Sequence, residues 1–218
     1  MATRTKRRGG QERSEPERSA PAGEPEALAW VPRRMFFTSG VGTHETLRVA
    51  MQRAMHEAGV ADSNLVKISS VIAPSCQVIT REHGLRLLRP GNIVHAVIAQ
   101  GETNEPHQRV TPALCWAQPD DPTLPGYVTE VEEEECKGMT EKTATDTAGE
   151  ALITMVAERV GVRGVNAKKL WANRGRAARI RVGPVTVRVG SRTATAVGAE
   201  VRDGERIHTV AMVMAIYV

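Results

Sequence analysis

Apolar residues recur along the chain with two periods, which predict two helices within a mostly β protein. A helical spacing of three and four residues is shared by Leu47, Ala50, Met51, Ala54, Met55 and Ala58. The same spacing recurs between residues 144 and 156, so a second helix is expected over residues 140–160. Thr43 is expected to cap the start of the first helix and Gly59 its end.

Apolar and β-branched runs bounded by Pro and Gly predict the strands. They fall at residues 34–38, 64–70, 78–80, 92–100, 109–118 and 126–131, and from residue 179 to the end. A turn is expected at residues 39–42, where Ser-Gly-Val-Gly interrupts the apolar run. Helices spaced widely among consecutive strands are typical of the α+β class with mostly antiparallel sheets.

The composition suits one soluble domain with a tail, since the 218 residues are 41% hydrophobic and 25% charged. The apolar runs are of strand length, which excludes a membrane-spanning helix. The basic start of the chain is not followed by an apolar segment, so it is not a secretory signal, and the cytoplasm is the expected compartment. Cys76, Cys115 and Cys136 form no CxxC motif and are expected to be free and buried. The histidines show no ligand spacing, so no metal is expected.

Charge is distributed unevenly along the chain. Residues 1–34 carry eight Lys or Arg against five Glu, and thus supply three of the four net positive charges. Their composition predicts a disordered basic tail over residues 1–29, followed by a single domain over residues 30–218. Residues 166–192 hold eight basic and no acidic residues, whereas residues 130–135 hold five glutamates. An uncleaved protein that binds nucleic acid or another polyanion is therefore one candidate, although no aromatic residues interleave with these arginines.

Common catalytic and nucleotide-binding motifs do not fit the chain. The pair Gly40 and Gly42 lacks the third glycine of a dinucleotide-binding loop, since Glu45 occupies that position. There is no Walker A, GxSxG or HExxH sequence.

One local arrangement gives a more specific indication of function. The segment Asn-Leu-Val-Lys-Ile-Ser-Ser-Val-Ile-Ala-Pro at residues 64–74 places two serines at the end of an expected strand. Together with Phe-Phe-Thr-Ser-Gly-Val-Gly-Thr-His at 36–44, Leu-Leu-Arg-Pro-Gly at 87–91 and Gly-Tyr-Val-Thr-Glu at 126–130, it resembles the pyruvoyl-dependent arginine decarboxylase family, particularly its bacterial members. The resemblance covers residues 35–218.

The resemblance implies a proenzyme that cleaves itself between Ser69 and Ser70. The Ser70 hydroxyl would attack the carbonyl carbon of Ser69, and elimination and hydrolysis would leave a pyruvoyl cofactor in place of Ser70. Such attack requires a strained turn or a carbonyl polarised by positioned donors. Asn64 matches a family position linked to the site and is a candidate for that support. The pyruvoyl ketone would condense with the substrate amine and accept the electrons released as carbon dioxide leaves.

Glu130 matches the family's proton donor, and the like charges of the following glutamates would raise its pKa. A Glu130→Gln variant would then be cleaved but catalytically poor. Gln52 stands where many relatives carry an acidic residue facing the arginine guanidinium, so a decarboxylase for another amino acid remains an alternative.

The resemblance further implies a four-layer αββα sandwich that assembles as a trimer or a dimer of trimers, with active sites between subunits. The expected activity is conversion of a small-molecule substrate, arginine, to agmatine and carbon dioxide. Neither a membrane nor a nucleic acid is an expected partner.

Overall fold

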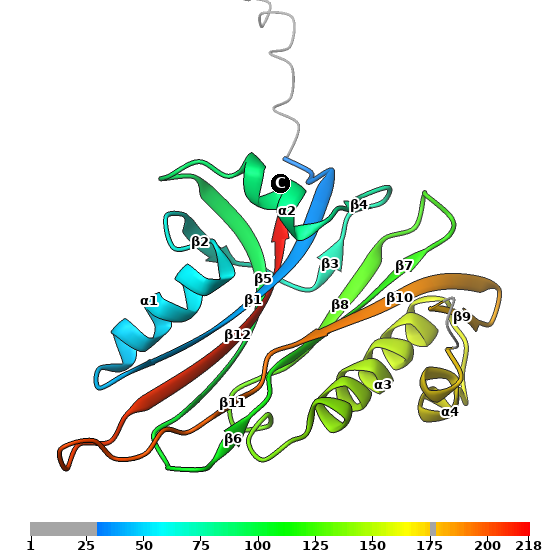
Figure 1. Cartoon of the computed structure of the whole chain (residues 1–218). Helices are drawn as coiled ribbons and strands as arrows, with labels where there is room; N and C mark the ends of the chain where they lie inside the picture. The colour runs from blue at the N-terminus through cyan, green and yellow to red at the C-terminus, as the bar shows by residue number, and fades with distance from the viewer. Residues whose placement is uncertain (1–29, 175–177) are drawn as a thin grey trace, which may run out of the picture. The chain divides into compact units, whose positions relative to one another are not determined.

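Two five-stranded sheets form the centre of the domain that spans Val31–Val218 (Figure 1). The structure is a computed structural model that describes residues 30–174 and 178–218. The tail predicted over residues 1–29 lies outside the described residues, as does Arg176 of the basic segment.

The first sheet has the strand order β2-β5-β12-β1-β4. Its strands are β2 (Asn64–Lys67), β5 (Ile93–Thr103), β12 (His208–Tyr217), β1 (Arg34–His44) and β4 (Gln77–Val78). The second sheet has the order β3-β8-β7-β10-β9, with β3 (Val71–Ile72), β8 (Gly126–Val131), β7 (Ala113–Pro119), β10 (Val185–Thr193) and β9 (Arg179–Val182). A further pair joins β11 (Ala196–Val197) to β6 (Arg109–Val110). The predicted α+β class is confirmed, and among the described strands only β2 with β5 and β1 with β4 pair in parallel.

Four helices in the described part of the chain cover the outer faces of the two sheets. They are α1 (Leu47–Ala58), α2 (Arg81–Leu87), α3 (Glu141–Arg159) and α4 (Ala167–Ala172). One apolar core lies between the sheets and contains Val97, Leu114 and Val213. A second core joins α1 to the first sheet, and a third joins α3 and α4 to the second sheet. The layers are therefore helix, sheet, sheet and helix, as the resemblance implies (Figure 1).

The turn predicted at residues 39–42 is wrong, because β1 runs without interruption to His44. Gly40 and Gly42 are instead the places where α1 approaches this strand. A Cβ atom at Gly40 would lie 2.1 Å from the carbonyl oxygen of Ala54, and one at Gly42 would lie 2.1 Å from that of Ala50. Only glycine permits so close an approach of helix and strand backbones.

The two long helices were predicted from their periodicity, and both are confirmed. α1 begins after Thr46 rather than at Thr43, which lies in β1, and it ends at Gly59 in the left-handed conformation. The hydroxyl of Thr140 accepts from the backbone N–H of Thr143 and caps α3. The short helices α2 and α4 were not predicted, since six or seven residues are too few to establish a helical period.

Two predicted strands are interrupted in the structure. The strand expected at residues 64–70 ends at Lys67, and the chain resumes as β3 at Val71. The strand expected at residues 109–118 divides at Thr111 and Pro112 into β6 and β7. The three cysteines are free and buried, as predicted. Within the described part of the chain, no helix has both the length and the apolar character needed to cross a membrane.

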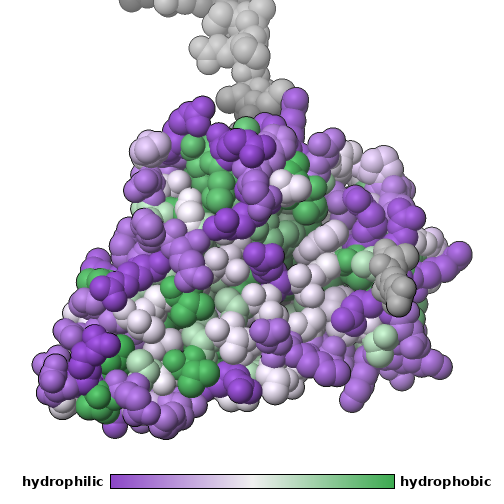
Figure 2. All heavy atoms as spheres, viewed as in Figure 1, coloured by the Kyte–Doolittle hydropathy of each residue, from purple (hydrophilic) through white to green (hydrophobic). Residues whose placement is uncertain are grey.

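The surface mixes polar side chains with smaller apolar patches, as the face seen in Figure 2 illustrates. Exposed large apolar side chains include Val49, Val66, Val71, Ile93, Val197 and Val201. Val66 and Val71 belong to β2 and β3, the strands that flank the Ser-Ser segment, and Ile93 begins β5, the strand that pairs with β2.

Candidate active site

The Ser-Ser segment lies where the chain passes from one sheet to the other. β2 pairs with β5 in the first sheet, and β3 pairs with β8 in the second. Only residues 68–70 separate the two strands. The peptide bond between Ser69 and Ser70 is therefore part of a short crossing between two fixed sheets.

Backbone hydrogen bonds hold both sides of this crossing. The N–H of Ile68 donates to the carbonyl of Ala96 in β5 at 3.0 Å. The carbonyl of Ser70 accepts from the N–H of Val128 in β8 at 2.8 Å. The residues on either side of Ser69 are thus hydrogen-bonded to different sheets.

A tight turn polarises the Ser69 carbonyl. Its oxygen accepts a hydrogen bond from the N–H of Val71 at 3.0 Å, which closes a three-residue turn centred on Ser70. A donor aimed at this oxygen would stabilise negative charge developing there. The expected polarising donor is therefore present as a backbone group.

Ser70 contacts the predicted proton donor directly. Its hydroxyl donates to the carboxylate of Glu130, with Oγ 3.1 Å from one oxygen and 3.0 Å from the other. Glu130 lies near the end of β8, the strand that also holds the Ser70 carbonyl through Val128. The pairing of β3 with β8 therefore brings the two side chains together across a gap of sixty positions.

Burial is the largest cause of a raised pKa for the Glu130 carboxyl. The hydrogen bond from Ser70 lowers the pKa, the charge of Glu132 raises it, and the charge of Lys67 lowers it. The expectation that neighbouring glutamates raise this pKa therefore holds for Glu132, but burial acts more strongly.

Glu132 is paired rather than part of a solvated acidic edge. Its carboxylate accepts from the Nζ of Lys67, at 2.9 Å and 3.0 Å to its two oxygens. The remaining glutamates of the acidic run, at positions 133, 134 and 135, are exposed, as expected for a solvated edge. The contact with Lys67 was not predicted. Lys67 lies within the segment 64–74 that carries the resemblance, and Glu132 follows the segment 126–130.

The two supporting residues lie apart from the Ser70 hydroxyl. Asn64 begins β2, five positions before Ser69, and its amide donates to the carbonyl of Gly91 at 3.1 Å. Gln52 is exposed on α1, the helix that covers the outer face of the first sheet. Their expected roles at the site remain predictions.

Tyr217 is a residue of the site that the sequence did not indicate. Its buried hydroxyl lies 3.5 Å from the carbonyl of Val71, and burial raises its pKa, with smaller contributions from Cys76 and Glu130. Tyr217 ends β12, and the place of this strand between β5 and β1 is not evident from the sequence.

The basic segment makes many contacts within the chain. Arg179 pairs with Asp120, and Arg188 donates to Gln118. Arg174 stacks over the ring of Trp171 and donates to its carbonyl. These contacts weaken the case for a polyanion-binding surface, because these three guanidinium groups already have partners.

Comparison with known proteins identifies the family of the chain. Residues 34–218 match the family described as pyruvoyl-dependent arginine decarboxylase. The chain is 36% identical over 144 residues to pyruvoyl-dependent arginine decarboxylase 2 of Methanosarcina acetivorans, covering 66% of this chain and 76% of that protein. It is 36% identical over 135 residues to the pyruvoyl-dependent arginine decarboxylase of Nitrosopumilus maritimus, covering 62% and 72% of the two chains. The chain therefore belongs to the pyruvoyl-dependent arginine decarboxylase family.

Proposed function

We propose that the chain cleaves itself between Ser69 and Ser70 and that the product converts arginine to agmatine and carbon dioxide. The observation that carries this proposal is the hydrogen bond from the Ser70 hydroxyl to the Glu130 carboxylate, next to a Ser69 carbonyl that already accepts from Val71. A nucleophile, a proton acceptor and a polarised carbonyl are the three parts that the cleavage requires.

The first step transfers an acyl group from nitrogen to oxygen. Glu130 accepts the hydroxyl proton of Ser70 while Oγ bonds to the carbonyl carbon of Ser69, and the Val71 N–H faces the oxygen that becomes negative. The C–N bond then breaks as the Ser70 nitrogen takes up a proton. The peptide has become an ester, with both sides still held by Ile68 and Val128.

The ester is then opened by elimination. Loss of the Cα proton of former Ser70 expels the carboxylate of Ser69, which becomes the end of the first fragment. The remaining dehydroalanine adds water and releases ammonia, which leaves a pyruvoyl group at the start of the second fragment. No oxidant or reductant is needed, because this step takes up one water molecule and releases one ammonia molecule.

The residues around Ser70 suit such a group. Ser70 supplies all of its carbon atoms, and it is half-buried in contact with Glu130. The pyruvoyl ketone supplies an electron sink when it condenses with a substrate amine. The protein must then place a proton on the substrate α-carbon, and two observations support Glu130 in this role, its contact with Ser70 and a pKa raised by burial.

The same carboxyl group would thus act as a base during cleavage and as an acid during decarboxylation. This double use requires a pKa above the ordinary carboxyl value, so that both protonation states are accessible.

We also propose that the active sites lie between subunits of a trimer or a dimer of trimers. The apolar side chains of Val66, Val71 and Ile93 are exposed beside the crossing, where burial in an assembly would stabilise them. Gln52 is exposed as well, so it could serve a neighbouring subunit's site. Asn64 would support the site from β2 once the assembly has formed.

A substrate panel tests the proposed activity. The purified protein is incubated separately with L-arginine, L-ornithine, L-lysine and L-histidine, and released carbon dioxide and the amine product are measured. We expect agmatine from arginine, and no activity in the Ser70→Ala variant. Release of carbon dioxide from another amino acid alone would assign that substrate instead. The uncharged Gln52, which offers no charge pairing to a guanidinium, is the reason for including the other amino acids. Release from none of the four would contradict the proposal.

A further inference from the structure

We infer that Lys67 and Glu132 form a positioning pair whose opposite charges balance each other at Glu130 from across the cleavage point. This inference rests on the proposed function and assigns two residues to it. Lys67 precedes the scissile bond, whereas Glu132 follows it. After cleavage, the first fragment would therefore contribute a charge to the catalytic group of the second.

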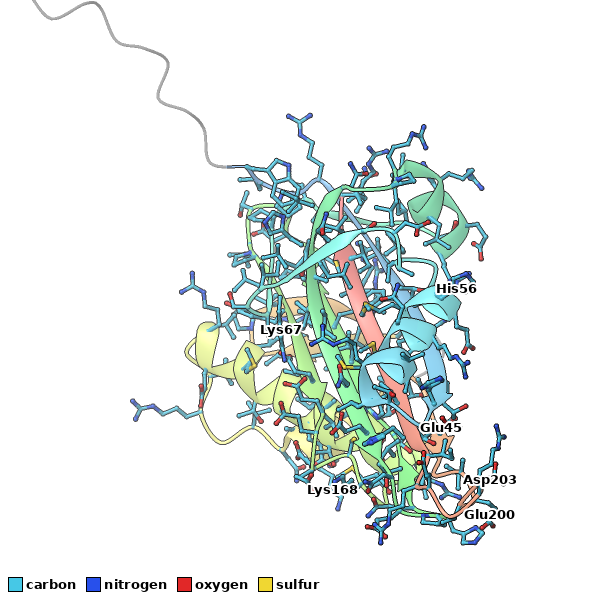
Figure 3. All side chains as sticks on the ribbon, turned by 90° about the vertical axis from the view of Figure 1, so that its left-hand side faces the viewer. Glu45, His56, Lys67, Lys168, Glu200 and Asp203 are labelled. Atoms are coloured by element: carbon cyan, nitrogen blue, oxygen red, sulfur yellow. The ribbon has the colours of Figure 1, made fainter. Side chains whose placement is uncertain are left out.

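The geometry is that of a specific ion pair. The Nζ of Lys67 contacts both carboxylate oxygens of Glu132, at 2.9 Å and 3.0 Å. The side chain of Glu132 is 25% exposed and that of Lys67 is 53% exposed, so the carboxylate is the less solvated partner. Lys67 lies on the side of the domain viewed in Figure 3, at the end of a strand paired with β5.

Both charges act on Glu130. Glu132 stands two positions after Glu130, and its negative charge raises the pKa of the Glu130 carboxyl, whereas the ammonium of Lys67 lowers it. Opposite charges held together nearly cancel at a third group, but the loss of either one leaves the other uncompensated. The pair thus prevents its own charges from shifting the pKa of the Glu130 carboxyl far in either direction.

Two further titratable groups of this region, Tyr217 and Cys76, are uncharged near pH 7 because burial raises the pKa of each. Tyr217 of β12 is buried, and burial raises its pKa. Cys76, between β3 and β4, is also buried, and its pKa is raised to about 11. His95 of β5 stands opposite Tyr217 in the strand register. Glu132 and Lys67 are the charged groups that act on Glu130.

The pair also survives the cut. β2 remains attached to β5 through its own pairing, from Asn64 with Ile93 to Lys67 with Ala96, none of which involves the scissile bond. Glu132 is likewise fixed by its neighbour, because the N–H of Glu133 donates to the carbonyl of Gln100 in β5 at 2.6 Å. The same strand therefore holds both partners after cleavage.

A double-mutant cycle in the full-length protein tests this inference. The dependence of kcat/KM on pH for L-arginine is measured for Lys67→Met, Glu132→Gln and the double variant. If protonated Glu130 is required, activity is lost as pH rises through its pKa. Lys67→Met should move this loss to higher pH and Glu132→Gln to lower pH, each by about half a pH unit. The double variant should return close to the wild-type profile.

Two controls separate charge from structure. Lys67→Arg keeps the charge and should keep the profile. Lys137→Met removes another lysine–glutamate pair, with Glu134, which does not act on Glu130, and should leave the profile unchanged.

Equal profiles for all variants, or shifts of Lys67→Met and Glu132→Gln in the same direction, would overturn the inference. If Lys67→Met fails to fold, Glu132→Gln alone still tests it, since its shift must be toward lower pH. A wild-type protein that neither splits nor decarboxylates would instead refute the proposed function, so the two failures are distinguishable.

Discussion

At the scale of single residues, one carboxyl group joins both halves of the proposed chemistry. Glu130 accepts from the Ser70 hydroxyl in the uncut chain, and burial raises its pKa. The sequence predicts that Glu130→Gln is still cleaved but decarboxylates poorly. Because the contact with Ser70 exists before cleavage, we now expect cleavage to be slowed as well.

We therefore expect Glu130→Gln to slow both reactions by at least about 100-fold, since an amide neither accepts nor donates the required proton. Cleavage is followed by cell-free synthesis and denaturing electrophoresis, and decarboxylation by agmatine release. The matched control is Glu135→Gln, which changes an exposed member of the same acidic run and should leave both rates near wild type. In the wild type, the cleavage rate should rise with pH, and kcat/KM for decarboxylation should fall, through a range above the ordinary carboxyl pKa of about 4.3. Fast cleavage of Glu130→Gln would show that Glu130 is not the base of the first step.

At the scale of elements, the contact between α1 and β1 organises the first fragment. Gly40 and Gly42 let the helix backbone lie directly on the strand, and Ala50, Ala54 and Ala58 are the buried helix residues. Small residues on both sides of a contact permit this approach, and larger ones would force the elements apart.

Gly40→Ala should therefore lower the free energy of unfolding by about 1–3 kcal/mol or more, because the added methyl group meets the backbone of Ala54. Urea denaturation measures the change, with Ser39→Ala in the same strand as a control that adds no atoms. A Gly40→Ala variant as stable as the control would show that the helix can move away at little cost.

The sequence predicted the long periodic elements and missed features that depend on contacts between elements. Leu47 to Ala58 shows its helix through spacing alone, whereas the glycines of β1 suggest a turn until the packing of α1 is known. Ser69, Ser70 and Glu130 came from the family resemblance. The contact between Lys67 and Glu132 could not be predicted, since the two residues are 65 positions apart and their contact depends on how the two sheets are placed.

At the scale of the whole molecule, cleavage would cut a crossing between sheets without separating them. β1 lies between β12 and β4, and its pairing with β12 runs from Met35 to His44. Both neighbours belong to the second fragment. The first fragment would thus contribute the central strand β1, the packed helix α1 and the edge strand β2 to a shared fold. We therefore expect the two products to remain associated without a covalent link.

The mass of the purified protein under denaturing conditions tests the central claim most directly. The account predicts two species, residues 1–69 ending in a free carboxylate and residues 70–218 beginning with a pyruvoyl group. The two should elute together under native conditions, and Ser70→Ala should give one intact chain in both. A wild-type protein that remains one full-length chain, with no carbonyl group that reacts with hydrazine reagents, would contradict the account.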